Sequence, residues 1–344
     1  MTKTYRYSRV DLIKITSVIL LVALALFIVA VGADGIEEAD KKRNAEATAR
    51  IRRGIEEFAD SIDLSELSIK PADLGRIFSD VLKDAPYLFY VSNNLSYTYR
   101  QSGYVVTVSP KYIMGKEEAE EAVNYCKSEI YKMVELASSA KTELERLVFA
   151  HDLICQKFMY DTTLESNNMY SFLKSGRGTC QGYTWTYMAL LRELGIECRY
   201  VASDTILHIW LAVRIDGEWY YSDVTWDDPP SKEGVGEYSR AHLLFSDEKA
   251  DKYGYSDRYG AEDIRCKSKI YDGNDLSQIY PFCTLSGDVD HDGDITLYDL
   301  LLLRLYLENK SALSKYFCLV CSDAYSDVCI DRSDVEYIRR VILE

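Results

Sequence analysis

The segment that decides the fold of this protein is residues 178–195, GTCQGYTWTYMALLRELG. Its apolar residues recur at helical spacing, and the run ends at Gly195, a residue type that commonly terminates helices. Gly176 and Gly178 interrupt any element that comes before. The segment therefore predicts a buried helix with Cys180 at or near its first turn. The apolar residues at this spacing are Trp185, Met188, Ala189 and Leu191.

Cys180 in that position has two interpretations. The first turn of a helix offers unpaired N–H groups and the positive end of the dipole, which favour a thiolate and can bind an oxyanion. The other interpretation is an inert buried cysteine. The segment alone does not separate the two.

A hairpin signal follows the helix. Residues 207–215 and 218–226 are two β-rich runs separated by Asp216-Gly217. Asp-Gly is among the strongest short signals for a two-residue turn. With that turn, the residues on either side of it face each other, and the register of the whole hairpin follows.

This register brings His208 and Asp223 together. They become diagonal neighbours on one face, with backbones roughly 7–8 Å apart, a gap that the two side chains can close. A slip of one residue would place them on opposite faces. Taken singly, His208 could be a satisfied core histidine and Asp223 a strand-end carboxylate. Asp227 and Asp228 compete for the same role, but strand alternation favours Asp223.

Cys180, His208 and Asp223 together make the set that cysteine acyl transfer requires. A thiolate attacks a carbonyl carbon, an imidazole moves the proton, and a carboxylate holds the imidazole in the correct tautomer. We therefore predict that these three residues are catalytic.

The motifs around these residues resemble the transglutaminase-like superfamily, a branch of the papain-like cysteine enzymes. The resemblance covers residues 160–229 and rests on GTCQGY at 178–183, HIW at 208–210 and WYYSDVTWDDP at 219–229. It implies an α+β papain-like core in which Cys180 is the nucleophile, His208 the base and Asp223 the third member of the triad. Thr179 and Ile209 depart from the commoner pattern without touching the chemistry.

The resemblance leaves the reaction open, because the family contains transamidases, peptidases, deamidases and inactive members. We expect a cysteine acyl-transfer enzyme acting on a protein or peptide substrate. Hydrolysis is favoured over cross-linking, because no segment indicates an amine-acceptor site. The alternative is a catalytically silent module with a structural or adhesive role.

A second functional signal lies near the C-terminus, in residues 288–299, DVDHDGDITLYD. Oxygen-bearing side chains stand at the positions of a twelve-residue calcium loop, and Gly293 stands at the sixth, where the turn needs a permissive residue. We therefore predict that the segment binds Ca²⁺, with a helix following over residues 297–308. The alternative is a solvated acidic turn. The predicted metal-site residues are Asp288, Asp290, Asp292, Asp294, Thr296 and Asp299.

Residues 323–334 repeat this pattern weakly. Tyr325 replaces an oxygen ligand at the third position, and Val328 replaces the glycine, although valine is poorly suited to a left-handed turn. The predicted ligands of this second, weaker site are Asp323, Asp327, Asp331 and Asp334.

The two loop-plus-helix units, over residues 287–344, resemble a dockerin domain. That resemblance implies a small all-α domain that binds a cohesin module on a scaffold protein. Such scaffolds assemble the cellulosomes of anaerobic bacteria, which break down polysaccharides. The degenerate second repeat puts dual-mode cohesin binding in doubt.

The N-terminus predicts export. Basic residues precede an apolar run over residues 15–31, and small residues before Asp34 offer a cleavage site. The run is long for a signal peptide and short for a membrane span, so a retained anchor stays open. We therefore expect residues 1–33 to be a signal peptide or signal anchor. The protein would then be extracellular or at the cell surface, touching a membrane only through that segment.

Composition narrows the choice of partners. The formal net charge of −15 argues against nucleic acid, which requires basic surfaces. Nine cysteines show no tight disulfide framework, and connectivity cannot be derived from their spacing. Cys318 and Cys321 form a CxxC pair with no second pair or nearby histidine, which argues against zinc.

The chain length of 344 residues suits two folded domains plus an export segment. We predict an N-terminal helical and β extension at 34–115, the catalytic domain at 116–284 and the dockerin at 287–344. Within the extension, residues 35–62 and 70–82 are expected to be helical. Residues 87–112 are expected to form a small meander with turns at Asn93-Asn94 and Ser102-Gly103.

Overall fold

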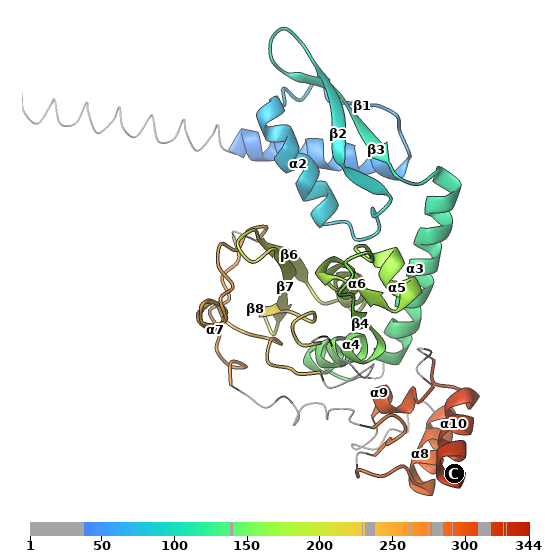
Figure 1. Ribbon diagram of the computed structural model, residues 1–344. Coiled ribbons are helices and arrows are strands. Elements are labelled where there is room, and N and C mark those ends of the chain that lie inside the picture. The colour runs from blue at the N-terminus through green and yellow to red at the C-terminus, as the bar shows by residue number, and fades with distance from the viewer. Residues whose placement is uncertain are drawn as a thin grey trace, which may run out of the picture. The chain divides into compact units, whose positions relative to one another are not determined.

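The computed structural model describes residues 38–137, 140–228, 230, 238–261, 263–273, 276, 285–290, 292–308, 318–325, 327 and 329–344. These residues form two compact units, one from residues 38–81 with 93–111 and the other from residues 82–92 with 112–344. Figure 1 shows their helices and strands. The predicted export segment, residues 1–33, lies outside the described residues.

The first unit combines helices with a three-stranded sheet. Residues 38–56 are helical, and α2 (Pro71–Lys83) follows close to the predicted bounds. Its buried residues recur at the spacing of one helix face: Leu74, Ile77, Phe78 and Val81. The sheet has the order β1-β3-β2, with β1 at Ile62–Asp63, β2 at Val91–Tyr99 and β3 at Val105–Tyr112.

The predicted meander is only partly right. The turn at Ser102-Gly103 is confirmed, and Gly103 has a φ of 85°. The turn at Asn93-Asn94 is wrong, because both residues lie inside β2. β2 is an edge strand, where exposed polar side chains do not disturb the packing of the sheet.

The second unit has a mixed α and β core, as the resemblance implied. Its helices are α3 (Lys116–Ala137), α4 (Glu143–Lys157), α5 (Met169–Ser175), α6 (Cys180–Glu193) and α7 (Asp247–Tyr253). A short parallel pair joins β4 (Met159–Tyr160) to β5 (Arg177–Gly178). An antiparallel sheet follows in the order β6-β7-β8, with β6 at Cys198–Ser203, β7 at His208–Ile215 and β8 at Glu218–Ser222.

Helix α6 is the centre of this unit. It packs against α4 and α5 and against strands β6 and β7. Nine of its fourteen residues are buried, so it is apolar around most of its circumference. The strand β7 is buried along nearly its whole length, as expected for the middle strand of a covered sheet.

The hairpin register agrees with the prediction. Ile215 pairs with Glu218 and Leu211 with Ser222, so paired residue numbers have a constant sum. Asp216 and Gly217 have φ angles of 52° and 84°, as a two-residue turn of the primed type requires.

The second strand is shorter than predicted. β8 ends at Ser222, not at Trp226, because the carboxylate of Asp223 accepts the backbone N–H groups of Thr225 and Trp226 at 3.1 and 3.2 Å. That local turn takes the chain out of the ladder immediately after the strand.

The C-terminal part contains α8 (Leu297–Glu308), α9 (Leu319–Ser322) and α10 (Arg332–Leu343). Helices α8 and α10 pack against each other. Among the described helices, none is long and apolar enough to cross a membrane. The described cysteines carry free thiols except Cys321, which is disulfide-bonded.

Candidate functional site

Cys180 is the first residue of α6 and is half-buried. The cap residue Thr179 makes no side-chain hydrogen bond to the first turn, so its hydroxyl does not occupy the N–H groups there. The glycines of the motif have a packing role. A Cβ on Gly178 or Gly182 would lie 2.4 or 2.8 Å from the side chain of Phe172 on α5.

His208 and Asp223 meet beside this helix end. His208 is the first residue of β7, and its Nε2 lies 2.6 Å from Oδ2 of Asp223. Nδ1 is then the ring nitrogen that does not bind Asp223, and Cys180 is close enough to raise the pKa of the imidazole. The structure therefore brings the three predicted residues together.

The Asp223 carboxylate is almost fully buried, yet both of its oxygens are hydrogen-bonded. Oδ1 accepts two backbone N–H groups from the turn that follows β8. Oδ2 accepts from His208 and from the hydroxyl of Tyr255 at 2.7 Å. Each oxygen of the buried carboxylate therefore has two donors, which offset the cost of its burial.

Two tryptophans enclose the imidazole of His208. The ring of Trp226 stacks on it at 4.9 Å between centroids, and the ring of Trp210 lies at 5.8 Å, nearly parallel. These ring contacts restrict the orientation of the imidazole plane. The charge of His208 is therefore set by its polar neighbours.

Those neighbours hold a proton on the imidazole. Burial lowers the pKa of His208, but the charge and hydrogen bond of Asp223, together with Cys180, raise it to about 10. An imidazolium beside a thiol at a helix N-terminus favours the thiolate form of that thiol.

Side-chain hydrogen bonds connect helix α6 to the strands and the loop that carry His208 and Asp223. The hydroxyl of Thr184 donates to the carbonyl of Ile209, next to His208, at 3.1 Å. The hydroxyls of Tyr187 and Ser222, next to Asp223, lie 3.2 Å apart. Tyr183 donates to the carboxylate of Asp228. Each bond fixes the distance from the nucleophile helix to another part of the site.

A second cysteine–histidine pair lies fully buried beneath this site. His151 and Cys155 are one turn apart on α4, with Sγ and Nε2 3.9 Å from each other. The imidazole of His151 bridges two carboxylates, with Nδ1 3.0 Å from Asp152 and Nε2 3.1 Å from Asp227. Arg240 pairs with Asp152 on the other side.

The environment of this second group does not activate its thiol as a nucleophile. Burial raises the pKa of the Cys155 thiol to about 12 despite the adjacent His151, so the thiol stays protonated. Its Sγ donates to the carbonyl of Val224, 3.6 Å away, inside the loop that follows Asp223. The group therefore supports the loop of the candidate active site.

Asp227 and Asp228 do not compete with Asp223 for His208. Asp227 accepts from His151 and from the backbone and ring of His242, and Asp228 accepts from Tyr183. Burial raises the pKa of Asp228 to about 7, against the opposing hydrogen bond from Tyr183. For Asp227, burial is outweighed by hydrogen bonds from the two histidines, and its pKa falls to about 2.

Sequence reasoning missed several residues that support the site, among them Tyr255, His151 and Arg240. The HDLIC segment at residues 151–155 was a usable signal, because it places a histidine and a cysteine on one helix face. Tyr255 and Arg240 had no local signal, since their partners are 32 and 88 residues away.

The predicted calcium loop is compact. The side chains of Asp288, Asp290 and Asp292 place one oxygen each within 4.8 Å of one another. Burial, followed by the charges of Asp299, Asp292 and Asp288, raises the pKa of Asp290. Carboxylates gathered in this way suit a hard cation such as Ca²⁺. Asp294 and Thr296 lie in the same loop, whereas His291 lies outside the described residues.

The second loop has the same pattern of backbone hydrogen bonds as the first. Asp299 accepts N–H groups from the third and ninth loop positions, Asp290 and Thr296, at 3.2 and 2.7 Å. Asp334 does the same with Tyr325 and Asp331 at 2.9 and 2.8 Å. The two segments are therefore structural repeats. Asp323 and Asp327 hold the first and fifth positions, and Val328 lies outside the described residues.

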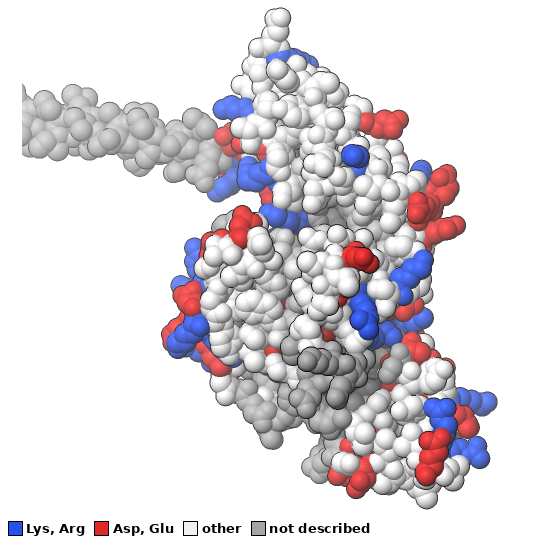
Figure 2. Space-filling view, viewed as in Figure 1, with Lys and Arg blue, Asp and Glu red and all other residues white. Residues whose placement is uncertain are grey.

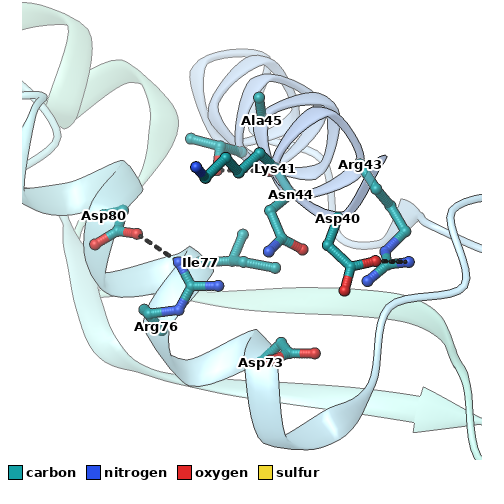
Figure 3. Close-up of a pocket in the computed structure, with 10 residues that line it drawn as sticks. Asp40, Lys41, Arg43, Asn44, Ala45, Asp73, Arg76, Ile77 and Asp80 are labelled. Atoms are coloured by element: carbon teal, nitrogen blue, oxygen red, sulfur yellow. Dashed lines mark hydrogen bonds and ion pairs between the residues drawn. The ribbon is translucent and has the colours of Figure 1, made fainter. Parts of the chain in front are cut away.

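The first unit contains a separate cavity of about 790 Å³ between the helix over residues 38–56 and α2 (Figure 3). Ion pairs line it, Arg43 with Asp40 at 2.8 Å and Arg76 with Asp80 at 3.6 Å. The residues that line it include no cysteine or histidine, so it does not provide the groups for acyl transfer.

The charged surface agrees with the composition. On the face drawn in Figure 2, acidic and basic side chains are interspersed over the described residues, without a broad basic area. Nucleic acid is therefore not the expected partner of this face.

Comparison with known proteins identifies one domain. Residues 132–224 match the family model of the transglutaminase-like superfamily. This match covers Cys180, His208 and Asp223, and the chain therefore contains a transglutaminase-like domain. No curated protein matches the sequence.

Solved structures overlap with the chain only in part. A structure described as a TGase is 13% identical, covers 44% of this chain and 49% of its own, and has a TM-score of 0.29. A candidate cysteine protease from Cytophaga hutchinsonii is 16% identical, with coverages of 38% and 61% and a TM-score of 0.24. A candidate protease from Parabacteroides distasonis is 14% identical, with coverages of 38% and 35% and a TM-score of 0.23. The chain spans less than two thirds of the length of each, and overlap of this extent does not define its chemistry.

Proposed function

We propose that this protein is a cysteine acyl-transfer enzyme that hydrolyses amide bonds of a protein or peptide substrate. One observation carries the proposal: His208 is held by Asp223 at 2.6 Å, and Cys180, at a helix N-terminus, is close enough to raise the pKa of the imidazole. Nucleophile, base and orienting carboxylate then act as one unit.

In the first half of the reaction, the Cys180 thiolate attacks the carbonyl carbon of a backbone or glutamine side-chain amide. The carbonyl oxygen becomes an oxyanion, which the N–H groups of the first turn of α6 can bind. The C–N bond then breaks, and the imidazolium of His208 gives its proton to the leaving amine. A thioester on Cys180 and a neutral His208 remain.

In the second half, His208 takes a proton from a water molecule, which attacks the thioester carbon. The C–S bond breaks, the acid product leaves, and the thiolate and imidazolium are restored. A primary amine in place of water would give transamidation. We favour water, because no sequence segment indicates an amine-acceptor site.

The test is mass spectrometry of protein substrates incubated with wild-type and Cys180→Ala protein, with and without an added primary amine. Mass changes made only by the wild type support acyl transfer, and incorporation of the amine would assign transamidation. No change from the wild type on any substrate would favour the alternative, a silent module with a structural or adhesive role. Alkylation then decides, because an activated Cys180 reacts fast below neutral pH and an inert thiol does not.

We also propose that the C-terminal segment binds Ca²⁺ and acts as a dockerin. The three gathered carboxylates of the first loop, with Asp294, Thr296 and Asp299, support a calcium site. The second loop carries Asp323, Asp327, Asp331 and Asp334 but has Tyr325 at a ligand position, so its affinity should be lower. Calorimetric titration of the full chain with Ca²⁺ tests this, with Asp290→Ala and Asp327→Ala as paired variants. Loss of the tighter site in Asp327→Ala rather than Asp290→Ala would contradict the assignment.

An exposed apolar row supports a partner for this segment. Leu297, Tyr298, Leu301 and Leu305 of α8 are between 46% and 70% exposed. Exposed apolar residues that gather on one element mark a binding surface. We propose that the partner is a cohesin module of a scaffold, which would dock the enzyme in a polysaccharide-degrading complex such as a cellulosome. Retention of the full chain on immobilised cohesins, and its loss in Leu301→Asp, is the expected result.

Export remains part of the proposal. The basic residues and apolar run at residues 1–33 support an extracellular or cell-surface location. N-terminal sequencing of the protein recovered from its native source would show whether the segment is cleaved or retained as an anchor. Recovery of the full-length chain from the cytosol alone would contradict export.

A further inference from the structure

Tyr255 makes a side-chain contact to Asp223 that neither the motifs nor the proposed mechanism accounts for. It is fully buried, and its hydroxyl donates to Oδ2 of Asp223 at 2.7 Å. The same oxygen accepts from Nε2 of His208 at 2.6 Å. Two donors therefore share the oxygen on which the orientation of the imidazole depends.

The position of Tyr255 is fixed by its backbone. Gly254 ends α7 in the left-handed conformation, with φ of 85°, and turns the chain. The N–H of Tyr255 then donates to the carbonyl of Ala250 at 3.0 Å. The hydroxyl is thus held in place without depending on the hydrogen bond to Asp223.

The ring of Tyr255 is part of the aromatic wall of the site. It lies 4.7 Å from Trp210 and 4.5 Å from Trp226, the two rings that enclose His208. Phe245 lies 5.1 Å away on the far side. Contacts of this kind leave the ring little rotational freedom, so the hydroxyl is presented to Asp223 in one orientation.

The chemistry of the hydroxyl is that of a permanent donor. Burial, followed by the charge of Asp223, raises the pKa of Tyr255 far above its ordinary range, so it keeps its proton at any working pH. A phenol that donates to a carboxylate withdraws charge from it and stops it rotating.

We propose that Tyr255 is a positioning residue of the catalytic site, which locks the Asp223 carboxylate toward His208 and limits the negative charge that the imidazole experiences. This rests on the proposed function and deepens it. Tyr255 does not touch the reacting atoms; it acts through Asp223. Its removal should slow the chemical step while leaving substrate affinity unchanged.

The test compares Tyr255→Phe with Tyr221→Phe. Tyr221 is 5% exposed, belongs to the same cluster of buried side chains, and donates its hydroxyl to a carboxylate, Asp247, at 3.0 Å. Both variants therefore lose the same kind of hydrogen bond, but only one of the carboxylates contacts His208. Tyr255→Phe should lower kcat about tenfold, the effect of one lost hydrogen bond, with KM unchanged. Tyr221→Phe should leave kcat within about twofold of wild type.

The second readout is the pH profile of Cys180 alkylation, which does not need turnover. With more charge left on Asp223, the imidazolium of His208 should keep its proton to higher pH. The alkylation rate of Cys180 changes at alkaline pH where His208 loses its proton, and we call this change the alkaline limb. The limb, set by the His208 pKa of about 10, should then move upward by up to about one pH unit. The charged and titratable groups around His208 and Tyr255 include Cys180, Asp223, Asp227, His242 and Tyr253, and all of them are retained in both variants.

The outcomes distinguish failure of the role of Tyr255 from failure of the proposed reaction. An unmoved limb in Tyr255→Phe, or an equal shift in Tyr221→Phe, overturns the role of Tyr255 whether or not the enzyme turns over. A shifted limb with no turnover in the wild type would retain the positioning role and remove the proposed reaction. If Tyr255→Phe does not fold, fluorotyrosine placed at residue 255 keeps the shape and strengthens the donor. It should move the limb downward, and an unmoved limb there also overturns the proposal.

Discussion

In the described part of the second unit, a cysteine, a histidine and an aspartate meet at two places, which differ in backbone setting and in access to water. Cys180 starts a helix and is half-buried, whereas Cys155 lies within a helix and is fully buried. His208 faces one carboxylate and two stacked rings, whereas His151 lies between two carboxylates.

The difference teaches that residue types alone do not make a nucleophile. The thiol of Cys155 has a histidine within 3.9 Å, yet burial raises its pKa to about 12. The helix end and partial exposure are what distinguish Cys180. The buried group instead supports the loop that carries Asp223, through Val224, Asp227 and His242.

The largest expected contrast is between the two cysteines. Cys180→Ala should abolish turnover, a loss of about 10⁴-fold or more, because the nucleophile is gone. Cys155→Ser, which keeps a donor for Val224, should retain activity within about tenfold. Mass spectrometry of products measures both. Activity that survives in Cys180→Ala would remove the proposed mechanism.

The two aspartates should separate activity from stability. Asp223→Asn should lower kcat by about 10⁴-fold in a protein that still folds, because the imidazole loses its orienting partner. Asp227→Asn should cost about 3–5 kcal/mol of stability, because it leaves His151 with a broken buried ion pair. Denaturant unfolding and turnover are measured on both. Equal loss of turnover in the two folded variants would contradict the distinction.

Thiol reactivity should also differ between Cys180 and Cys155. In the folded protein at pH 6, iodoacetamide should label Cys180 while Cys155 remains unlabelled. His208→Ala should slow labelling of Cys180 by about ten- to a hundredfold, because the imidazolium that favours the thiolate is lost. Peptide mapping after labelling gives both rates. Unchanged labelling in His208→Ala would break the inferred pair.

Because His208 stays protonated through neutrality, the rate at which Cys180 is labelled should not change with pH in that range.

Protonation of His208 should also make the stability of the protein depend on pH. Its folded pKa of about 10 lies above its ordinary value of 6.5, so the stability from the imidazolium is present below pH 6.5. That stability is lost as the pH rises through about 10. Unfolding free energy measured between pH 6 and 11 should fall in the wild type, and the fall should be smaller in His208→Ala.

The smallest expected effect comes from the bond between Tyr183 and Asp228. The folded pKa of Asp228, about 7, lies above its ordinary value of 3.8, so stability falls as the pH rises from about 4 to 7. The Tyr183 hydroxyl opposes this fall by stabilising the carboxylate. Tyr183→Phe should therefore cost about 1 kcal/mol at pH 5 and more at pH 8. A cost that does not depend on pH would mean that the bond is not to the ionised group.

Much of the candidate site was predictable because its signals are local. The Asp-Gly turn set the register of β7 and β8, and the glycine-bounded apolar run placed Cys180 at the start of α6. The loop spacing at residues 288–299 likewise predicted a group of carboxylates, and three of them gather. Backbone conformations that few residue types adopt, such as positive φ at Gly217, make such signals specific.

Other features had no local signal. The early end of β8 was missed, because the Asp223 carboxylate bonds to the N–H groups of its own turn, and strand propensity does not include that competition. The turn expected at Asn93-Asn94 was wrong for the opposite reason, since pairing in the sheet overrode a turn preference.

The sequence by itself therefore determined the helix that presents Cys180, the hairpin that joins His208 to Asp223, and the spacing of the acidic loops. Each depends on residues close together in the chain. The tertiary structure alone decided that Cys155 stays protonated, that Asp227 and Asp228 bind other partners, and that Tyr255 completes the environment of Asp223. Those outcomes depend on burial and on hydrogen bonds between residues far apart in the chain. Desolvation and pairing energies of that kind exist only once the chain has packed.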